Sequence, residues 1–273
     1  MPPLLLRLRR ALALVTLGAG SSAGLLSCDR PDEGGTEITV LALYTPAAKA
    51  RAGDVETHIR DAFALTNDVY RSGRIGAHLR LVRLAETPYQ EADRLTNLAR
   101  LLDPDDGPLD DVHTLRDRYA ADLVVLVIDR PGATVNASIL ATEATAFVIL
   151  HWEDLGPPKY GFAHEIGHLH GARHAPNEDP SQTPFPYGHG FRNDSLMTIM
   201  AGGGQKRVPV FSGPDQNWRG VTMGEATLHD NARVLRETAA YLSNFRGPKT
   251  PTSFVPPGTW PTLYSAHAPD PDL

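Results

Sequence analysis

The stretch "AHEIGHLHGARHAPNED", residues 163–179, decides the fold and the chemistry that we expect of this chain. It places His164 and His168 four residues apart, with Glu165 directly after the first histidine. On an α-helix, two residues at this spacing lie about 40° apart on one face, so both imidazoles can reach one metal ion. Glu165 then lies beside the metal, where a carboxylate can hold and deprotonate a water molecule.

A glycine and a third histidine extend this pattern. Six residues separate His168 from His174, so a continuing helix would place the two about 240° apart. Gly171 lies between them, and glycine readily adopts the left-handed conformation with which many helices end. A turn there would bring His174 back to the ion held by His164 and His168. Three neutral histidines leave a fourth position open for water, so we predict a catalytic zinc site with Glu165 as its catalytic residue.

The alternative is a solvated helix that happens to be rich in histidine. Four of the 11 histidines of the chain lie between residues 163 and 179, and this concentration favours the metal site. His170 lies two positions from His168 and therefore on a different face of a helix. We expect His170 to support the ligands or to face solvent rather than to bind the metal.

The composition is that of a soluble globular protein. The chain has 273 residues, of which 41% are hydrophobic and 21% charged, enough for one sizeable domain or two small ones. The formal net charge is -6 and the sequence pI is about 6.0. Because nucleic-acid binders normally present a basic face, this balance argues against a nucleic-acid partner.

Residues 1–28 differ from the rest of the chain. The basic start "MPPLLLRLRR" and the uncharged run "ALALVTLGAGSSAGLL" predict an export signal. The run is about 16 residues long, short for a membrane span of roughly 20. Its end, "LLSC", resembles the lipobox of bacterial lipoproteins, which implies lipidation of Cys28 and a lipid anchor in the bacterial cell envelope. The alternative is an ordinary secretory signal with a leftover thiol and a secreted product.

The remaining chain divides into three parts. Residues 29–37 are a short polar tether, 38–246 form the expected catalytic domain, and the Pro-rich 247–273 suit a disordered or surface-draped tail. Apolar patterns predict strands at 38–45, 77–89, 121–129 and 144–152, and helices at 46–71, 93–103, 109–120 and 224–245. Alternating strands and helices indicate an α/β (α+β) layer fold with a mixed sheet. Cys28 is the only cysteine, so the fold holds without intramolecular disulfides.

The elongated histidine motif is the signature of the metzincin zinc peptidases. Downstream, "SLMTIMAGGG" (195–204) resembles the methionine turn of that family, with Met200 a better match than Met197. The alternative is that both methionines simply fill the core. Between residues 37 and 246, segments such as "ITVLALYTPAA" and "GVTMGEATLHDNARVLRETAAYLSNFR" resemble the bacterial reprolysin-like branch. Within it, the likeness is closest to the peptidyl-Asp metalloendopeptidases.

This resemblance implies a metzincin-like zincin fold with a twisted mixed sheet, an active-site helix and a mainly irregular and helical C-terminal subdomain. It implies one catalytic Zn²⁺, Glu165 as the general base, Met200 in the floor of the site, and protein or peptide substrates. The sequence supplies no argument for a Ca²⁺ ion in addition. We expect the strand at 144–151 to be the edge strand that pairs with an extended substrate.

The resemblance also suggests cleavage on the N-terminal side of aspartate. A cationic group near the S1′ subsite would then be needed, and Lys206 and Arg207, just after Met200, are the candidates for substrate binding. The alternative is two solvated surface charges. Two competing functions are an envelope lipoprotein that uses the shell only to bind proteins or metal, and a zinc hydrolase of non-peptide amides. The intact Glu165 and all three histidine ligands favour a zinc endopeptidase.

Overall fold

The computed structural model describes residues 35–136, 138–247, 254 and 256. The predicted signal, Cys28, most of the tether and nearly all of the 247–273 tail lie outside the described residues. A five-stranded sheet in the order β2-β1-β3-β5-β4 forms the centre of the fold. Its strands are β1 (Thr36–Tyr44), β2 (Ala77–Glu86), β3 (Leu123–Ile128), β4 (Val135–Asn136) and β5 (Phe147–His151). Strand β1 therefore begins within the expected tether.

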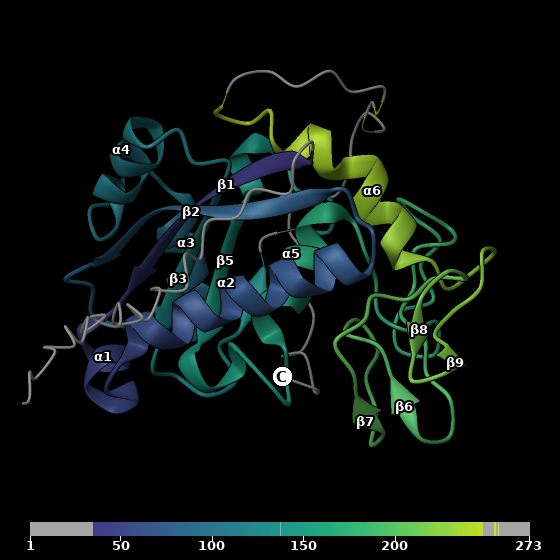
Figure 1. The fold of residues 1–273 in the computed structure, drawn as a ribbon. Helices are drawn as coiled ribbons and strands as arrows, with labels where there is room; N and C mark the ends of the chain where they lie inside the picture. Colours follow the sequence, from purple (N-terminus) through teal and green to yellow (C-terminus); the bar gives the residue numbers. More distant parts are fainter. Residues whose placement is uncertain (1–34, 137, 248–253, 255, 257–273) are drawn as a thin grey trace, which may run out of the picture. The chain divides into compact units, whose positions relative to one another are not determined.

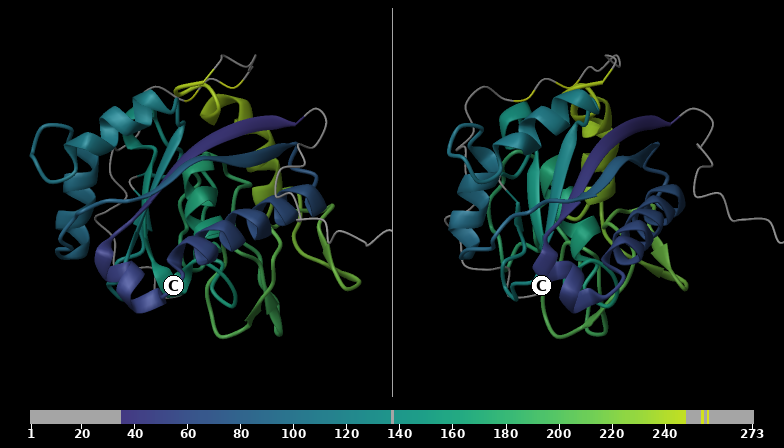
Figure 2. Two further views of the ribbon diagram at one scale, coloured as in Figure 1. Left: turned by 60° about the vertical axis from the view of Figure 1, so that its left-hand side comes forward. Right: turned by 90° about the vertical axis from the view of Figure 1, so that its left-hand side faces the viewer.

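Helices cover both faces of this sheet (Figure 1, Figure 2). They are α1 (Pro46–Ala52), α2 (Val55–Ser72), α3 (Arg94–Leu102), α4 (Asp110–Arg118), α5 (Gly161–His170) and α6 (Asn231–Leu242). Val40 and Ala42 of β1 pack in one core with α2, α5 and α6, whereas Leu41 and Leu43 pack in a second core with α3 and α4. Burial on both faces explains the unbroken apolar runs of the central strands. The α/β fold with a mixed sheet is confirmed.

The helix predicted at 46–71 is wrong in one respect, because the structure divides it into α1 and α2. Gly53 ends α1 with φ 72°, a left-handed conformation that glycine adopts readily. The side chain of Asp54 then accepts a hydrogen bond from the backbone N–H of Thr57 and caps the start of α2. The sequence signal was a glycine followed by a capping residue.

The edge of the sheet also differs from the prediction. Strand β5 pairs with β3 in parallel on one side and with β4 in antiparallel on the other, so the expected edge strand at 144–151 is an interior strand. Val135 pairs with Ile149, and Asn136 pairs with Val148. Within the described ranges, the two-residue β4 is the outermost strand on this side. After β3 the chain first forms β4 and then β5, and β5 lies between the other two. Strand β4 has only two residues, too few to show a strand pattern in the sequence.

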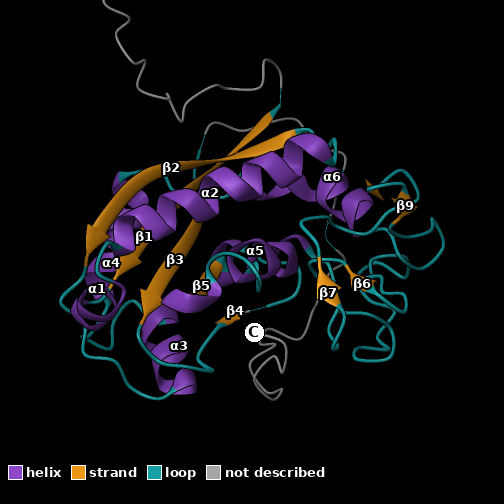
Figure 3. Ribbon diagram, turned by 60° about the horizontal axis from the view of Figure 1, so that its bottom comes forward, coloured by secondary structure: helices purple, strands orange, loops and turns teal. Residues whose placement is uncertain are grey.

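The C-terminal part is mainly irregular, as expected (Figure 3). It holds the short strands β6 (Leu196–Met197), β7 (Lys206–Arg207), β8 (Asn217–Trp218) and β9 (Val221–Thr222), and then α6. Helix α6 is shorter than the predicted 224–245 because Asp230 caps it, accepting from the backbone N–H of Arg233. In the part of the chain that the structure describes, no helix is both long and apolar enough to cross a membrane.

Candidate metal and catalytic site

Helix α5 carries the first two histidines and ends where the sequence requires it to end. Gly171 has φ 104°, and its backbone N–H reaches the carbonyls of Gly167 and His168. A Cβ at Gly171 would lie 2.8 Å from the ring of Phe185, so neither the conformation nor the space there suits a larger residue. The chain reverses after this turn, and His174 returns to the face of α5 that bears His164 and His168.

The three histidines form one compact cluster. The Nε2 atoms of His164 and His168 are 3.1 Å apart. The Nε2 atom of His174 lies 3.1 Å from that of His164 and 3.0 Å from that of His168. Ligands around a tetrahedral zinc ion at about 2.0–2.1 Å lie about 3.3 Å from one another, close to this arrangement. Among the residues described, this is the only group of three or more histidine, cysteine or acidic side chains that could hold a metal ion.

The protonation of the rings fits a metal ion. The Nδ1 atom of His164 lies 2.9 Å from the carbonyl oxygen of Ile199, and that of His168 lies 2.9 Å from the carbonyl oxygen of Ala172. A carbonyl only accepts hydrogen bonds, so each Nδ1 carries the proton and each neutral ring turns an Nε2 lone pair inward. Lone pairs this close together repel one another unless a cation lies between them. The residues therefore fit zinc.

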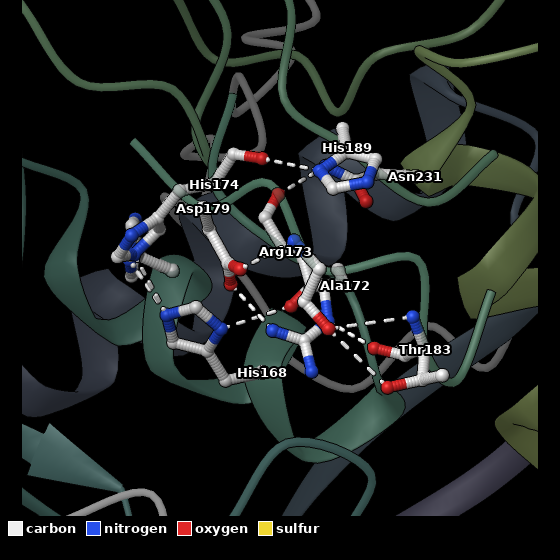
Figure 4. Close-up of polar contacts among 10 residues, drawn as sticks. His168, Ala172, Arg173, His174, Asp179, Thr183, His189 and Asn231 are labelled. Carbon is white, nitrogen blue, oxygen red and sulfur yellow. Dashed lines mark hydrogen bonds and ion pairs between the residues drawn. The ribbon is translucent and has the colours of Figure 1, made fainter. Parts of the chain in front are cut away.

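Backbone contacts hold the third ligand in place (Figure 4). The Nδ1–H of His189 donates to the carbonyl oxygen of His174 over 2.9 Å, and Asn231 donates to the preceding carbonyl, that of Arg173, over 3.3 Å. The guanidinium of Arg173 bonds to Asp179, 2.5 Å away, and to the carbonyl of Thr183. These contacts fix the loop that follows Gly171. Sequence reasoning did not find those of His189 and Asn231, because these residues lie 15 and 58 positions from their acceptors in the chain.

Glu165 and Met200 are both buried. Glu165 is buried on α5, next to His164 in the chain. Met200 is buried beneath α5, and a Cβ added to Gly167 would lie 2.6 Å from its sulfur. The carbonyl that receives His164 belongs to Ile199, so the methionine turn both supports the helix and orients a ligand. Met197 instead belongs to β6 and packs elsewhere.

The two candidate substrate-binding cations lie in different environments. Lys206 is exposed, whereas Arg207 is buried. The guanidinium of Arg207 donates to the carbonyl oxygen of Lys159 over 2.8 Å and to that of Ala201 over 3.0 Å. It therefore links the loop before α5 to the methionine turn.

His170 is buried and its ring bonds to Tyr70 and Thr238, so it neither faces solvent nor contacts a ligand, the two roles that we expected of it. The Thr238 hydroxyl donates to the carbonyl of Val234, so it accepts from the Nδ1–H of His170, 2.7 Å away. The Nε2 atom of His170 then accepts from the Tyr70 hydroxyl, 3.1 Å away. His170 thus ties the back of α5 to α2 and α6.

The fold and the site define the class of the protein. A helix with two converging histidines and a glutamate, a left-handed glycine turn, a third histidine and a buried methionine turn make up a metzincin zinc site. A family model described as metallo-peptidase family M12 matches residues 35–212. The chain belongs to this family.

Named relatives agree with this assignment. The chain is 40% identical over 216 residues to a peptidyl-Asp metalloendopeptidase of Xanthomonas campestris pv. campestris, covering 77% of this chain and 52% of the relative. It is 39% identical over 220 residues to one of Stenotrophomonas maltophilia, with the same two coverages. A third, from Pseudomonas fragi, is 30% identical over 185 residues, 66% of this chain and 99% of the relative. The chain spans about half the length of the first two relatives.

A solved structure supports the fold alone. The chain in "Structure of a chaperone-substrate complex" aligns with a TM-score of 0.64 at 20% identity, over 79% of this chain and 36% of that one.

Proposed function

We propose that this protein is a zinc-dependent endopeptidase that hydrolyses peptide bonds on the N-terminal side of aspartate. The observation that carries the proposal is the convergence of three histidine Nε2 atoms within 3.0–3.1 Å of one another on a helix that also bears Glu165. The names of the relatives support the preference for aspartate. All three histidines and Glu165 are present, which favours this function over that of a protein that uses the metzincin fold only for binding.

Each residue of the site has a separate role in hydrolysis. His164, His168 and His174 would hold zinc, which when bound polarises the scissile carbonyl and lowers the pKa of its water toward about 7. Glu165 accepts the proton of the attacking water and passes it to the leaving amine nitrogen. The short edge strand β4 pairs with the extended substrate, a role we transfer from the strand expected at 144–151. Met200 supports the floor of the site and takes no part in the chemistry.

We also propose that the protein is exported and anchored in the bacterial envelope by a lipid on Cys28. The support is the sequence alone: the basic start, the apolar run and "LLSC" directly before the mature chain. An anchored peptidase would act on proteins that pass through or reach the envelope. Without lipidation, the same signal would yield a secreted enzyme.

The decisive experiment compares the full-length protein with its Glu165→Gln variant on a proteome-derived peptide library. Cleavage sites are determined by mass spectrometry, with and without a zinc chelator. We expect chelator-sensitive cleavage before aspartate. The variant should cleave about 10²–10⁴-fold more slowly, because general-base catalysis is worth that much, and should keep its zinc, because Glu165 is not a ligand. Zinc binding without cleavage by the unaltered protein would favour the binding-protein alternative.

A further inference from the structure

The loop between α3 and α4 contains six consecutive exposed residues, 103–108, with the sequence "DPDDGP". Three of these six residues are aspartates, the residue before which the protein is proposed to cleave. Loop tips of small and polar residues are the sites at which folded proteins are most readily cut. The loop therefore offers a substrate within the chain itself.

The hydrogen bonds of this loop are local. The carboxylate of Asp103 accepts from the backbone N–H of Asp105 over 3.0 Å, and that of Asp110 accepts from the backbone N–H of Gly107 over 2.8 Å. The backbone N–H of Asp103 still bonds to a carbonyl of α3. A peptidase that takes its substrate in extended form would open little structure to reach the bonds before Asp105 and Asp106.

The other aspartates of the described chain are held in ordered structure. Several lie within α2 or α4, cap the start of a helix, or are partly buried. Asp122 and Asp154 are 1% exposed, so a peptidase reaches them only when the domain unfolds. Asp194 and Asp215 are exposed, but each lies in a run of only two exposed residues. The loop at 103–108 is the better site, because an extended substrate needs several accessible residues in sequence.

We propose that a second copy of the protein hydrolyses this loop before Asp105 or Asp106, an inference that rests on the proposed function. At the first of these bonds, the oxygen of a water molecule joins the carbonyl carbon of Pro104 and the C–N bond breaks. The nitrogen of Asp105 then leaves as an amine that carries one proton of the water. The reaction needs only the metal and catalytic site of the copy that cuts and the exposed loop of the copy that is cut.

The nicked chain should stay assembled. Leu98 and Leu101 of α3 and Leu109 and Val112 of α4 are at most 2% exposed, and they pack in one core with strands β4 and β5. Leu101 and Leu109 flank the loop, so both new chain ends remain anchored in this core. Because apolar burial holds α3 and α4 on the sheet, cleavage between them should leave the histidine cluster in place.

The test mixes the active full-length protein with a Glu165→Gln copy that carries a heavy nitrogen isotope, so that mass spectrometry assigns each fragment to the copy that was cut. We expect the labelled copy to be cut before Asp105 or Asp106 at least about 100-fold faster than before Asp122 or Asp154, because buried sites open only when the domain unfolds. The two fragments should co-elute in gel filtration and separate in denaturant.

A matched pair of labelled copies isolates the loop. The copy with both Asp105→Asn and Asp106→Asn should lose these cuts, because asparagine keeps the shape of the side chain without its charge. The copy with Asp194→Asn, at an exposed aspartate in another loop, should be cut within 103–108 as before. All three positions are exposed, so these changes should leave the midpoint of thermal unfolding within about 2 °C.

The outcomes separate this inference from the function on which it rests. If the active protein cleaves no library peptide before aspartate, the proposed function fails. If it does, but the labelled copy stays intact or is cut first before another aspartate between residues 35 and 247, the inference alone is overturned. Equal rates before Asp105 and Asp122 would show that the unfolded chain is the substrate, and would overturn it as well. Fragments that separate without denaturant would refute an assembled nicked chain.

Discussion

Within the motif, His170 differs from the other histidines in what its environment demands. The hydroxyls of Tyr70 and Thr238 satisfy both ring nitrogens of the neutral form, and burial lowers the pKa of His170 to about 3. The unfolded chain binds a proton at a pKa near 6.5. The neutral His170 therefore stabilises the folded state fully above about pH 6.5, and this contribution to the free energy of unfolding is lost as the pH falls toward 3.

The difference between the folded and unfolded pKa of His170 predicts that the free energy of unfolding falls in mild acid. Between pH 7 and pH 5, the neutral His170 should account for a loss of about 2 kcal/mol in the free energy of unfolding. We expect His170→Gln to show a correspondingly weaker pH dependence in urea unfolding with chelator present, although it is less stable at pH 7. The exposed His58 provides the control, and His58→Gln should follow the unaltered protein. Equal pH dependence in all three proteins would refute a buried neutral His170.

At the scale of elements, the end of α5 determines whether the site forms. The positive φ of Gly171 lets the chain reverse direction. The ring of Phe185 occupies the space that a side chain on Gly171 would need. Gly167 plays a similar part in packing, because its missing side chain lets the sulfur of Met200 approach the helix. Gly171 thus brings His174 back to the cluster, and Gly167 lets the methionine turn pack close to α5, where it orients His164.

Gly171→Ala should therefore damage both stability and zinc binding. The residue would be strained by its left-handed backbone and would meet Phe185 at 2.8 Å, so we expect a loss of about 1–3 kcal/mol in unfolding free energy. Displacement of His174 should weaken zinc affinity by about tenfold or more. Gly204→Ala is the matched control, since nothing lies within 4 Å of a Cβ there. Competition with a chromophoric chelator measures affinity, and unaltered affinity in Gly171→Ala would contradict this role.

At the scale of the whole described domain, Asp122 joins segments that are far apart in the chain. Its buried carboxylate accepts from the backbone N–H and the hydroxyl of Thr39, at 2.9 Å and 2.7 Å. The backbone N–H of Arg246 donates to its other oxygen over 3.0 Å. The Arg246 guanidinium also reaches Asp117 and Glu143. Beyond this point, Phe254 packs against Phe185 and Tyr241, so at this residue the Pro-rich segment contacts the domain.

Lipidation of Cys28 is the prediction that concerns where the whole protein acts. Expressed in a bacterium with its own leader, the protein should incorporate a labelled fatty acid and fractionate with membranes. Cys28→Ser should lose both, because no thiol remains to be acylated. Glu165→Gln is the control, since a change in the site should leave the label in place. Label retained by Cys28→Ser, or a soluble unaltered protein, would refute the anchor.

The order of the main elements could be predicted from local patterns. The runs at 38–45 and 121–129 gave β1 and β3, because interior strands of a parallel sheet are apolar throughout. The division of α1 from α2 was missed even though Gly53 signals it. The two-residue β4 was missed because its pairing with β5 depends on tertiary contact rather than on its own residues.

The sequence by itself predicted the three converging histidines, the neighbouring glutamate and the turn between the second and third histidines, since helical periodicity and glycine conformation are local properties of residues 163–174. Only the tertiary structure decided which strand forms the edge, that His170 is a buried support, and that Arg207 is buried whereas Lys206 is exposed. These outcomes depend on burial and on partners distant in the chain, such as Thr238 for His170 and Lys159 for Arg207. A pattern of neighbouring residues carries no information about such contacts.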